Sequence, residues 1–379
     1  MKSPFGKFTL LLTIALATTL LSCNETKKTV DDATGPAIIA YIDGSSSLDA
    51  SKIAANKITH VNYAFADIKD GKASLANKPT DTENIKKLNS LKTDNPKLKV
   101  LISVAARDWS KGFAKNPLTD DASQAFAESV IEIVRGNDLD GIDINWGYPI
   151  AANLKDIVST EGTSQNYVKV ISAIKDGLNA LEKETGKTYL LSCAAEAEAD
   201  YIPNMGMKEA QQNLDFINVM AYNNQDAKVA IHQAGLYASN KYNIRKAASV
   251  AIEDYINIGV SSEKLVMGIP FYGNVYKVKK NSSAGIGDPV VEKIGTKGYT
   301  SIKDSLINQN EYFRYWDNEA QAPYVYNFYK SELVTYDDEE SVKAKCEYVN
   351  DNNLGGIMFW EYGSDPKGFL LGAINQVLK

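Results

Sequence analysis

The segment from Asp140 to Gly147 (DGIDINWG) holds the residues whose types and spacing could carry out chemistry. Its polar residues alternate along a short apolar run, and alternate residues of a β-strand share one face. Carboxyl groups on such a face could donate a proton and stabilise developing positive charge. Of the alternating positions 143, 145 and 147, only Asp143 is acidic, because Asn145 is a neutral amide and Gly147 has no side chain. The segment therefore offers Asp143 as the one candidate acid–base residue among these three positions.

Composition argues against several other kinds of site. The two histidines (His60 and His232) and three cysteines in 379 residues are too few and too scattered for a His/Cys metal centre, and no metal or cofactor is expected. Cys193 and Cys346 each lie in an apolar run, which predicts two separate buried thiols rather than a disulfide. The formal net charge is −6 and no basic cluster is present, so nucleic acid is not an expected partner.

Short apolar runs alternate with longer helical patterns from residue 37 onward. The runs are continuous, which is typical of strands buried on both faces in a parallel sheet. Eight such strands separated by helices predict the α/β class and a (β/α)8 TIM barrel. A doubly wound sheet is the alternative, but no glycine-rich phosphate loop follows the first strand. The predicted strands are residues 37–43, 58–68, 98–105, 139–146, 189–196, 216–222, 264–273 and 355–363.

The gap between the seventh and eighth predicted strands is longer than most of the others. Residues 277–335 contain the strand-like and aromatic pieces GYTSI, EYFRYWD and APYVYNFY. This pattern predicts a small α+β insertion ahead of the last helix–strand unit. It would form one wall of a cleft over the carboxyl ends of the strands, where the active sites of TIM barrels lie.

The N-terminal part of the chain has the pattern of an export leader followed by a tether. Two lysines precede an apolar run that is short for a membrane span, and the run ends in Leu-Ser-Cys23, which resembles a bacterial lipobox. Residues 1–22 are therefore predicted to be a lipoprotein signal peptide, and Cys23 the lipidated residue; an ordinary secretory signal is the alternative. Residues 23–36 are polar and predict a flexible tether to a folded domain at 37–379. Asn24, rather than Asp, favours the outer membrane and the cell surface.

The segment DGIDINWGYP (140–149) closely resembles the signature of glycoside hydrolase family 18, the chitinases and related endo-β-N-acetylglucosaminidases. That signature is Asp-Gly-x-Asp-x-Asp-x-Glu, often followed by Tyr-Pro. Similar matches cover nearly the whole chain after the tether, and the resemblance implies a TIM barrel. The matching segments are 58–68, LISVAARDWSKGFA (101–114), MAYN (220–223), GIPFYG (268–273), YWDNEAQAPYVYN (315–327) and GGIMFWE (355–361).

The resemblance also shows which catalytic groups are missing. In the family, the last residue of the signature protonates the glycosidic oxygen, and the aspartate before it orients the substrate's N-acetyl group for attack on the anomeric carbon, a departure from the two-carboxylate route. These positions are Gly147 and Asn145 here, and Asn223 replaces an aspartate on the sixth strand. We therefore expect that hydrolase activity is lost. Asp140 and Asp143 either keep a role in the degenerate site or satisfy buried donors at its base.

The binding residues of the family are largely kept. By resemblance, Trp360 would stack under the pyranose ring next to the cleaved bond, and Tyr222 would donate to the N-acetyl carbonyl group. For Phe65 and Met220, core packing is the alternative. The ligand-binding residues carried over from the family are Trp360, Tyr222, Tyr41, Phe65, Met220, Asn223 and Arg107.

Other departures bear on how a ligand would fit. Ala105 and Ala106 replace two glycines of the third-strand motif, which would narrow the floor of the cleft. Arg107 stands where many chitinases have a stacking tryptophan, and Asn274 stands where the chitinase-like branch often has arginine.

The expected function is that of a lipid-anchored, catalytically inactive chitinase-like protein. It would capture N-acetylglucosamine-containing glycans, either chito-oligosaccharides or N-glycan cores, at the cell surface. Its partners would be that glycan, the membrane through the lipid anchor alone, and glycan-uptake transporter proteins. One alternative is an active glycosidase with a displaced acid, for which Glu196 and Glu198 at the end of the fifth strand are the candidates. Another is an interaction protein with a closed cleft.

Overall fold

The computed structural model describes residues 35–105, 119–145, 161–199, 201–202, 205–226, 228–240, 246–279 and 285–379. The statements below concern these residues. Several predictions lie outside them: the signal peptide, the lipidated Cys23, nearly all of the tether, Arg107 and Gly147.

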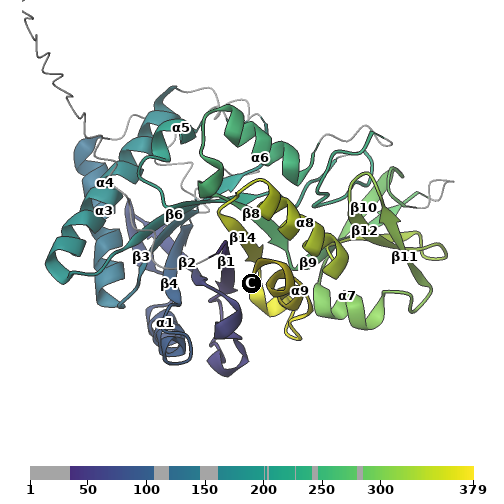
Figure 1. Cartoon of the computed structure of the whole chain (residues 1–379), viewed down its shortest axis with the longest axis horizontal. Helices are drawn as coiled ribbons and strands as arrows, with labels where there is room; N and C mark the ends of the chain where they lie inside the picture. Colours follow the sequence, from purple (N-terminus) through teal and green to yellow (C-terminus); the bar gives the residue numbers. More distant parts are fainter. Residues whose placement is uncertain are drawn as a thin grey trace, which may run out of the picture. The chain divides into compact units, whose positions relative to one another are not determined.

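Eight parallel strands form a closed barrel (Figure 1). Each strand pairs in parallel with its neighbours, and β1 pairs with both β14 and β2, which closes the sheet. The predicted TIM barrel is therefore confirmed, and each predicted strand is present. The barrel strands are β1 (Ala37–Asp43), β2 (His60–Lys69), β4 (Lys99–Ala105), β5 (Gly141–Asn145), β6 (Leu190–Glu196), β7 (Phe216–Met220), β8 (Leu265–Pro270) and β14 (Gly356–Trp360).

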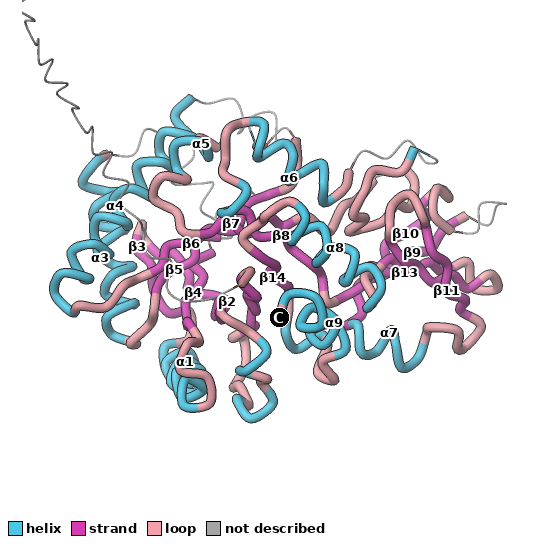
Figure 2. Tube along the Cα trace, viewed as in Figure 1, coloured by secondary structure: helices cyan, strands magenta, loops and turns pink. Residues whose placement is uncertain are grey.

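Helices surround the strands and cover their outer faces (Figure 2). In α3 the Thr119 side chain accepts a hydrogen bond from the Ala122 N–H at the N-terminus, and Phe126, Val130 and Val134 are fully buried on the face toward the barrel. This spacing of apolar residues explains why the segment forms a helix packed on the sheet. The described helices around the barrel are α1 (Lys78–Ser90), α3 (Asp120–Gly136), α4 (Glu161–Thr185), α5 (Met207–Ala210), α6 (Ala248–Asn257), α8 (Glu339–Asp351) and α9 (Phe369–Leu378).

The hairpin that follows β2 was not predicted. Strand β3 (Lys72–Leu75) pairs antiparallel with the end of β2 through a turn at Asp70 and Gly71. Both turn residues have positive φ, 51° and 75°, as a tight two-residue hairpin requires. The Asp-Gly pair was the sequence signal for this hairpin.

A five-stranded antiparallel sheet with one helix is inserted between β8 and α8. Its strand order is β10-β9-β13-β12-β11, and in Figure 2 it is the second group of strands, to the right of the barrel. The sheet begins at Tyr272, before the predicted Lys277, because the chain passes from the end of β8 almost directly into β9. The inserted elements are β9 (Tyr272–Val278), β10 (Val290–Gly298), α7 (Tyr299–Ser305), β11 (Tyr312–Asp317), β12 (Ala322–Asn327) and β13 (Glu332–Thr335).

Polar side chains fix the inserted sheet to the barrel. Arg314 of β11 pairs with Asp338 at 2.8 Å and with Glu340 at 2.7 Å, both at the start of α8. On the segment that follows β7, buried His232 lies 3.1 Å from Asp317 at the end of β11. Strand β11 of the insertion thus contacts both the start of α8 and the segment that follows β7.

Cys193 and Cys346 are both buried, free thiols. In the part of the chain that the structure describes, no helix is long and apolar enough to span a bilayer.

Candidate functional site

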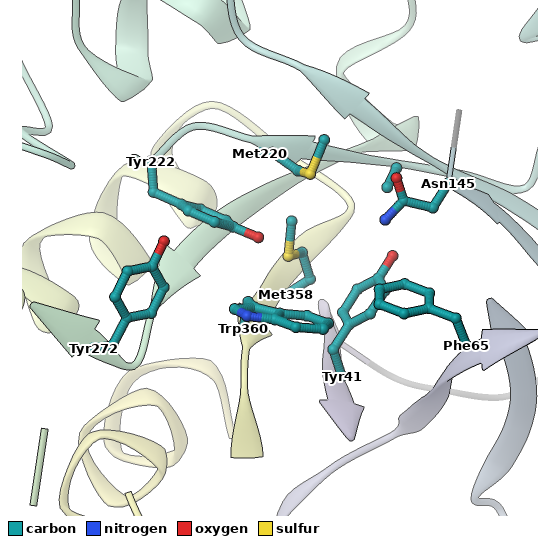
Figure 3. Close-up of a pocket in the computed structure, with 9 residues that line it drawn as sticks. Tyr41, Phe65, Asn145, Met220, Tyr222, Tyr272, Met358 and Trp360 are labelled. Carbon is teal, nitrogen blue, oxygen red and sulfur yellow. The ribbon is translucent and has the colours of Figure 1, made fainter. Parts of the chain in front are cut away.

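A pocket of about 200 Å³ lies at the carboxyl ends of the barrel strands (Figure 3). This is the end at which the active sites of TIM barrels are found. Figure 3 shows Asn145, Met220 and Tyr222 around the pocket, with Tyr272 at one side and Phe65 at the other. The lining residues are Tyr41, Phe65, Asn145, Ala194, Met220, Tyr222, Tyr272, Met358 and Trp360.

Aromatic rings provide much of this lining. Trp360, half-buried at the last position of β14, has its ring centre 5.4 Å from that of Phe65, with 18° between the two planes. The Tyr41 ring lies 5.9 Å from Trp360 at an angle of 55°. Tyr222 meets Tyr272 edge to face at 6.5 Å. Such walls favour ligands with flat apolar faces and a few polar groups.

The structure brings five of the seven predicted ligand-binding residues into this lining, and their binding role remains a prediction. Phe65 and Met220, for which core packing was the alternative, are only partly buried and pack at the edge of the barrel interior. Asn223 does not line the pocket, and Arg107 lies outside the described residues. The five are Tyr41, Phe65, Met220, Tyr222 and Trp360.

Asp143 lies fully buried in the barrel interior, where its carboxylate accepts four hydrogen bonds. Its Oδ2 accepts from the hydroxyls of Tyr41 at 2.9 Å and Ser103 at 2.6 Å. Its Oδ1 accepts from Ser192 at 2.7 Å and from the amide of Asn218 at 3.1 Å. Burial raises the pKa of Asp143, and the four donors oppose that rise. The carboxylate thereby links β1, β4, β5, β6 and β7 and has no place in the pocket lining.

Asp140 lies at the opposite end of the same strand, just before β5. Its carboxylate accepts the Val100 N–H at 2.7 Å and pairs with Lys92 at 2.7 Å. Asp140 therefore fixes the amino-terminal ends of β4 and β5. These contacts correspond to the structural alternative that the sequence offered, and a functional role for Asp140 remains a prediction.

Comparison with known proteins identifies the family of this chain, in agreement with the barrel fold and with the sequence signature at 140–149. The family model for glycosyl hydrolases family 18 matches residues 37–365. This chain belongs to glycoside hydrolase family 18. It is 29% identical over 429 residues to chitinase A1 of Niallia circulans, an alignment that covers 95% of this chain and 61% of the longer chitinase. It is also 28% identical over 335 residues to human chitinase-3-like protein 2, covering 81% of this chain and 79% of that protein.

Solved structures of family 18 enzymes share the fold. An N-acetylglucosaminidase of this family from Paenibacillus barengoltzii superposes with a TM-score of 0.81 at 31% identity, covering 90% of this chain and all of the enzyme chain. The described part of this chain therefore has the family 18 barrel fold.

The positions that the sequence resemblance assigns to family 18 chemistry are Asn145, Gly147 and Asn223. Asn145 ends β5 and lines the pocket, and Gly147 lies outside the described residues. Asn223, with a φ of 60°, accepts a hydrogen bond from the Asn274 amide at 3.3 Å. This hydrogen bond between two neutral amides joins the segment after β7 to β9.

Three lining residues were not singled out in the sequence: Ala194, Tyr272 and Met358. Alternation along the strands could have identified two of them, because Met358 precedes Trp360 by two residues and Ala194 is in register with Asn145. Gly268 on β8 explains how the Tyr222 ring fits, since a Cβ there would lie 2.8 Å from both Tyr222 and Met358.

The two candidates for a displaced acid differ in their surroundings. Glu196 is the last residue of β6 and partly buried, and burial together with the nearby Glu198 raises its pKa to about 7. Glu198 is exposed and pairs with Lys246 at 2.8 Å. Neither glutamate belongs to the pocket lining. Among the described residues, no group of three or more His, Cys, Asp or Glu side chains is placed to hold a metal ion.

Proposed function

We propose that this family 18 protein binds N-acetylglucosamine-containing oligosaccharides without cleaving them. The observation that carries the proposal is the combination of an aromatic pocket with a glycine and an amide at the two positions that the family uses for acid catalysis and substrate orientation. A ligand could still pack against the rings, while the leaving oxygen would have no proton donor at the family's position.

The energetic consequence for catalysis is large. A positioned general acid contributes about 10²–10⁴ in rate, and Gly147 offers no such group. Asn145 cannot hold the charge of the cyclic cation that the N-acetyl group forms in the substrate-assisted route. Asp143 does not replace it, because all four of its hydrogen bonds are made inside the barrel.

The proposed ligand class follows from the pocket and from the relatives. Trp360, the last residue of β14, contributes its indole ring to the pocket lining. The Tyr222 hydroxyl has no hydrogen-bond partner among the described residues and is available to a ligand. The names of the relatives, chitinases and an N-acetylglucosaminidase, favour β-linked N-acetylglucosamine over other sugars. Chito-oligosaccharides and N-glycan cores both contain such units.

Capture at the cell surface is part of the proposal. The lipobox-like sequence before Cys23 and the polar tether would place the barrel on the outer membrane through a lipid anchor. In that position the protein would deliver glycans to uptake transporters.

Binding can be tested by titrating residues 37–379 calorimetrically with N-acetylglucosamine oligomers of four to six units. We expect micromolar-to-millimolar affinity and no cleavage of the recovered sugar. Trp360→Ala is expected to weaken binding roughly thirtyfold, since truncating a central aromatic residue costs about 2 kcal/mol.

The matched control is Trp316→Ala. Trp316 is also a partly buried tryptophan, but it lies on β11 next to Arg314 and outside the pocket. Equal loss of affinity in both variants would contradict the assignment of the pocket. Absence of binding to chito-oligosaccharides and N-glycan cores alike would support an interaction protein, and shortened sugar would refute the loss of hydrolysis.

Restoring the two family residues tests the catalytic argument. The double change Asn145→Asp with Gly147→Glu is expected to produce slow but measurable hydrolysis of a chromogenic chito-oligosaccharide, well below that of a normal chitinase, because Asn223 keeps its amide. Asn145→Asp with Gly147→Gln supplies the same bulk without an acid and should stay inactive. Equal activity in the two variants would show that the missing acid does not explain the absence of cleavage.

The second candidate function is hydrolysis by Glu196. Its raised pKa, about 7, suits a general acid at neutral pH, but its side chain is outside the pocket lining. This alternative predicts cleaved sugar in the titration above and loss of that cleavage in Glu196→Gln.

A further inference from the structure

Glu196 is the last residue of β6 and, by strand alternation, shares a face with Ala194 at the end of the barrel that holds the pocket. Its neighbour in register on β7 is Met220, which lines the pocket. Ala194, two residues earlier on the same face of β6, also lines it. The carboxyl group therefore lies one step above the lining, on the side from which a ligand would enter.

Among the residues that the structure describes, this carboxyl group has no counter-ion. It makes no hydrogen bond or ion pair with any residue that the structure describes, whereas Glu198, two residues on, is paired with Lys246 at 2.8 Å. The nine lining residues include no lysine, arginine or histidine. Asn145 and Asn223 are neutral, so no described side chain at the pocket offsets the charge of Glu196.

The pocket is electrostatically suited to a cation for two further reasons. Buried Asp143 adds a second carboxylate beneath the lining. Glu196 is also close enough to Tyr222 to help raise the pKa of its hydroxyl, after burial and Tyr272. The faces of aromatic rings attract cations, and four tyrosine or tryptophan side chains, together with a phenylalanine, line this pocket.

We propose that Glu196 makes this pocket prefer oligosaccharides that contain glucosamine with a free, protonated 2-amino group over fully N-acetylated ones. The ammonium group would donate charge-assisted hydrogen bonds to the carboxylate while the sugar ring packs on the aromatic walls. The ligand class is thus partly or fully deacetylated chito-oligosaccharide. This inference rests on the proposed function, because it requires that the pocket binds amino-sugar oligomers.

The test is a pair of calorimetric titrations at pH 7, one with the glucosamine tetramer and one with the N-acetylglucosamine tetramer. We expect wild type to bind the glucosamine tetramer about tenfold more tightly, which is the effect of one charge-assisted hydrogen bond of about 1.4 kcal/mol. Glu196→Gln should lose this tenfold preference and keep its affinity for the acetylated tetramer. Glu198→Gln, which removes an equal charge nearby, should keep the preference.

The outcomes separate the two proposals. Binding of both tetramers with equal affinity by wild type would overturn the inference and leave the proposed function standing. A preference for the glucosamine tetramer that persists in Glu196→Gln but disappears in Glu198→Gln would also overturn the inference. So would a preference that both variants share with wild type and that disappears at 0.3 M salt. Either result would indicate general attraction of the ammonium groups to the acidic surface. If neither tetramer binds wild type, the proposed function fails and the inference fails with it. Thermal unfolding of each variant, with a single transition as in wild type, shows that the isosteric changes leave the fold intact.

Discussion

Replacing Asp143 by alanine is expected to lower the free energy of unfolding by about 3–5 kcal/mol. The change removes the acceptor of four buried hydrogen bonds from Tyr41, Ser103, Ser192 and Asn218. Each buried donor left without a partner costs about 1–3 kcal/mol. Relief of the cost of burying the charge offsets part of that sum, which is why the expected loss is smaller than four full penalties.

Urea unfolding followed by tryptophan fluorescence measures this effect. The matched control is Asp140→Ala on the same strand, where the lost partners are the Val100 N–H and a partly exposed Lys92. We expect the control to lose about 1 kcal/mol, because this pair is partly exposed and water can replace part of the lost contacts. A loss at Asp143 no larger than at Asp140 would show that the interior network contributes little to the stability of the barrel.

The sequence predicted the barrel strands but not the hydrogen-bond partners of Asp143. The strands were predictable because strands buried on both faces consist of continuous apolar runs, and the sequence contains eight such runs. The helical segments between successive runs then indicate a barrel. The residues at the carboxyl ends of the strands, Trp360 and Met220 among them, could be placed for the same reason. The sequence could not show that Asp143 is held by donors from four other strands, because that depends on their register around the closed barrel.

The pocket wall supplied by the insertion was harder to predict. Tyr272 is the first residue of β9 and belongs to the inserted sheet, yet it reaches the pocket beside Tyr222. Tyr272 lies at the pocket because β9 begins only two residues after β8 ends, and the sequence did not reveal this short connection. Likewise, the sequence left Glu196 and Glu198 as equal candidates, and the structure separates them by burial and by the ion pair that Glu198 makes with Lys246.

Glu196 is expected to destabilise the fold at alkaline pH. Its pKa rises from the ordinary 4.5 to about 7 in the folded protein, chiefly through burial and then through the charge of Glu198. At about 1.36 kcal/mol per pH unit, the ionised side chain costs up to about 3 kcal/mol. Below about pH 4.5 the carboxyl is protonated in the folded and unfolded states alike, so it costs nothing there. The cost grows as the pH rises from 4.5 to 7 and is complete above 7.

Glu196→Gln should therefore stabilise the protein by up to about 3 kcal/mol at pH 8.5 and leave its stability nearly unchanged at pH 4. Urea unfolding at the two pH values measures the difference. Glu198→Gln, which removes an exposed partner of Lys246, should change stability by less than about 0.5 kcal/mol at either pH. An equal gain for Glu196→Gln at both pH values would assign the effect to packing rather than to charge.

The Glu196 carboxylate destabilises the fold because its negative charge is unpaired, and a bound cation would supply the missing positive charge. If an ammonium group binds beside Glu196, part of the cost of burying the charge is recovered in the complex, and the pKa of the carboxyl should fall toward its ordinary value. The glucosamine tetramer should then raise the unfolding midpoint of wild type more at pH 6.5 than at pH 4, because its amine carries a charge at both pH values whereas the carboxyl group is protonated at pH 4. Glu196→Gln should show the same midpoint shift with either tetramer, and a larger shift with the glucosamine tetramer in that variant would place the amine elsewhere in the pocket.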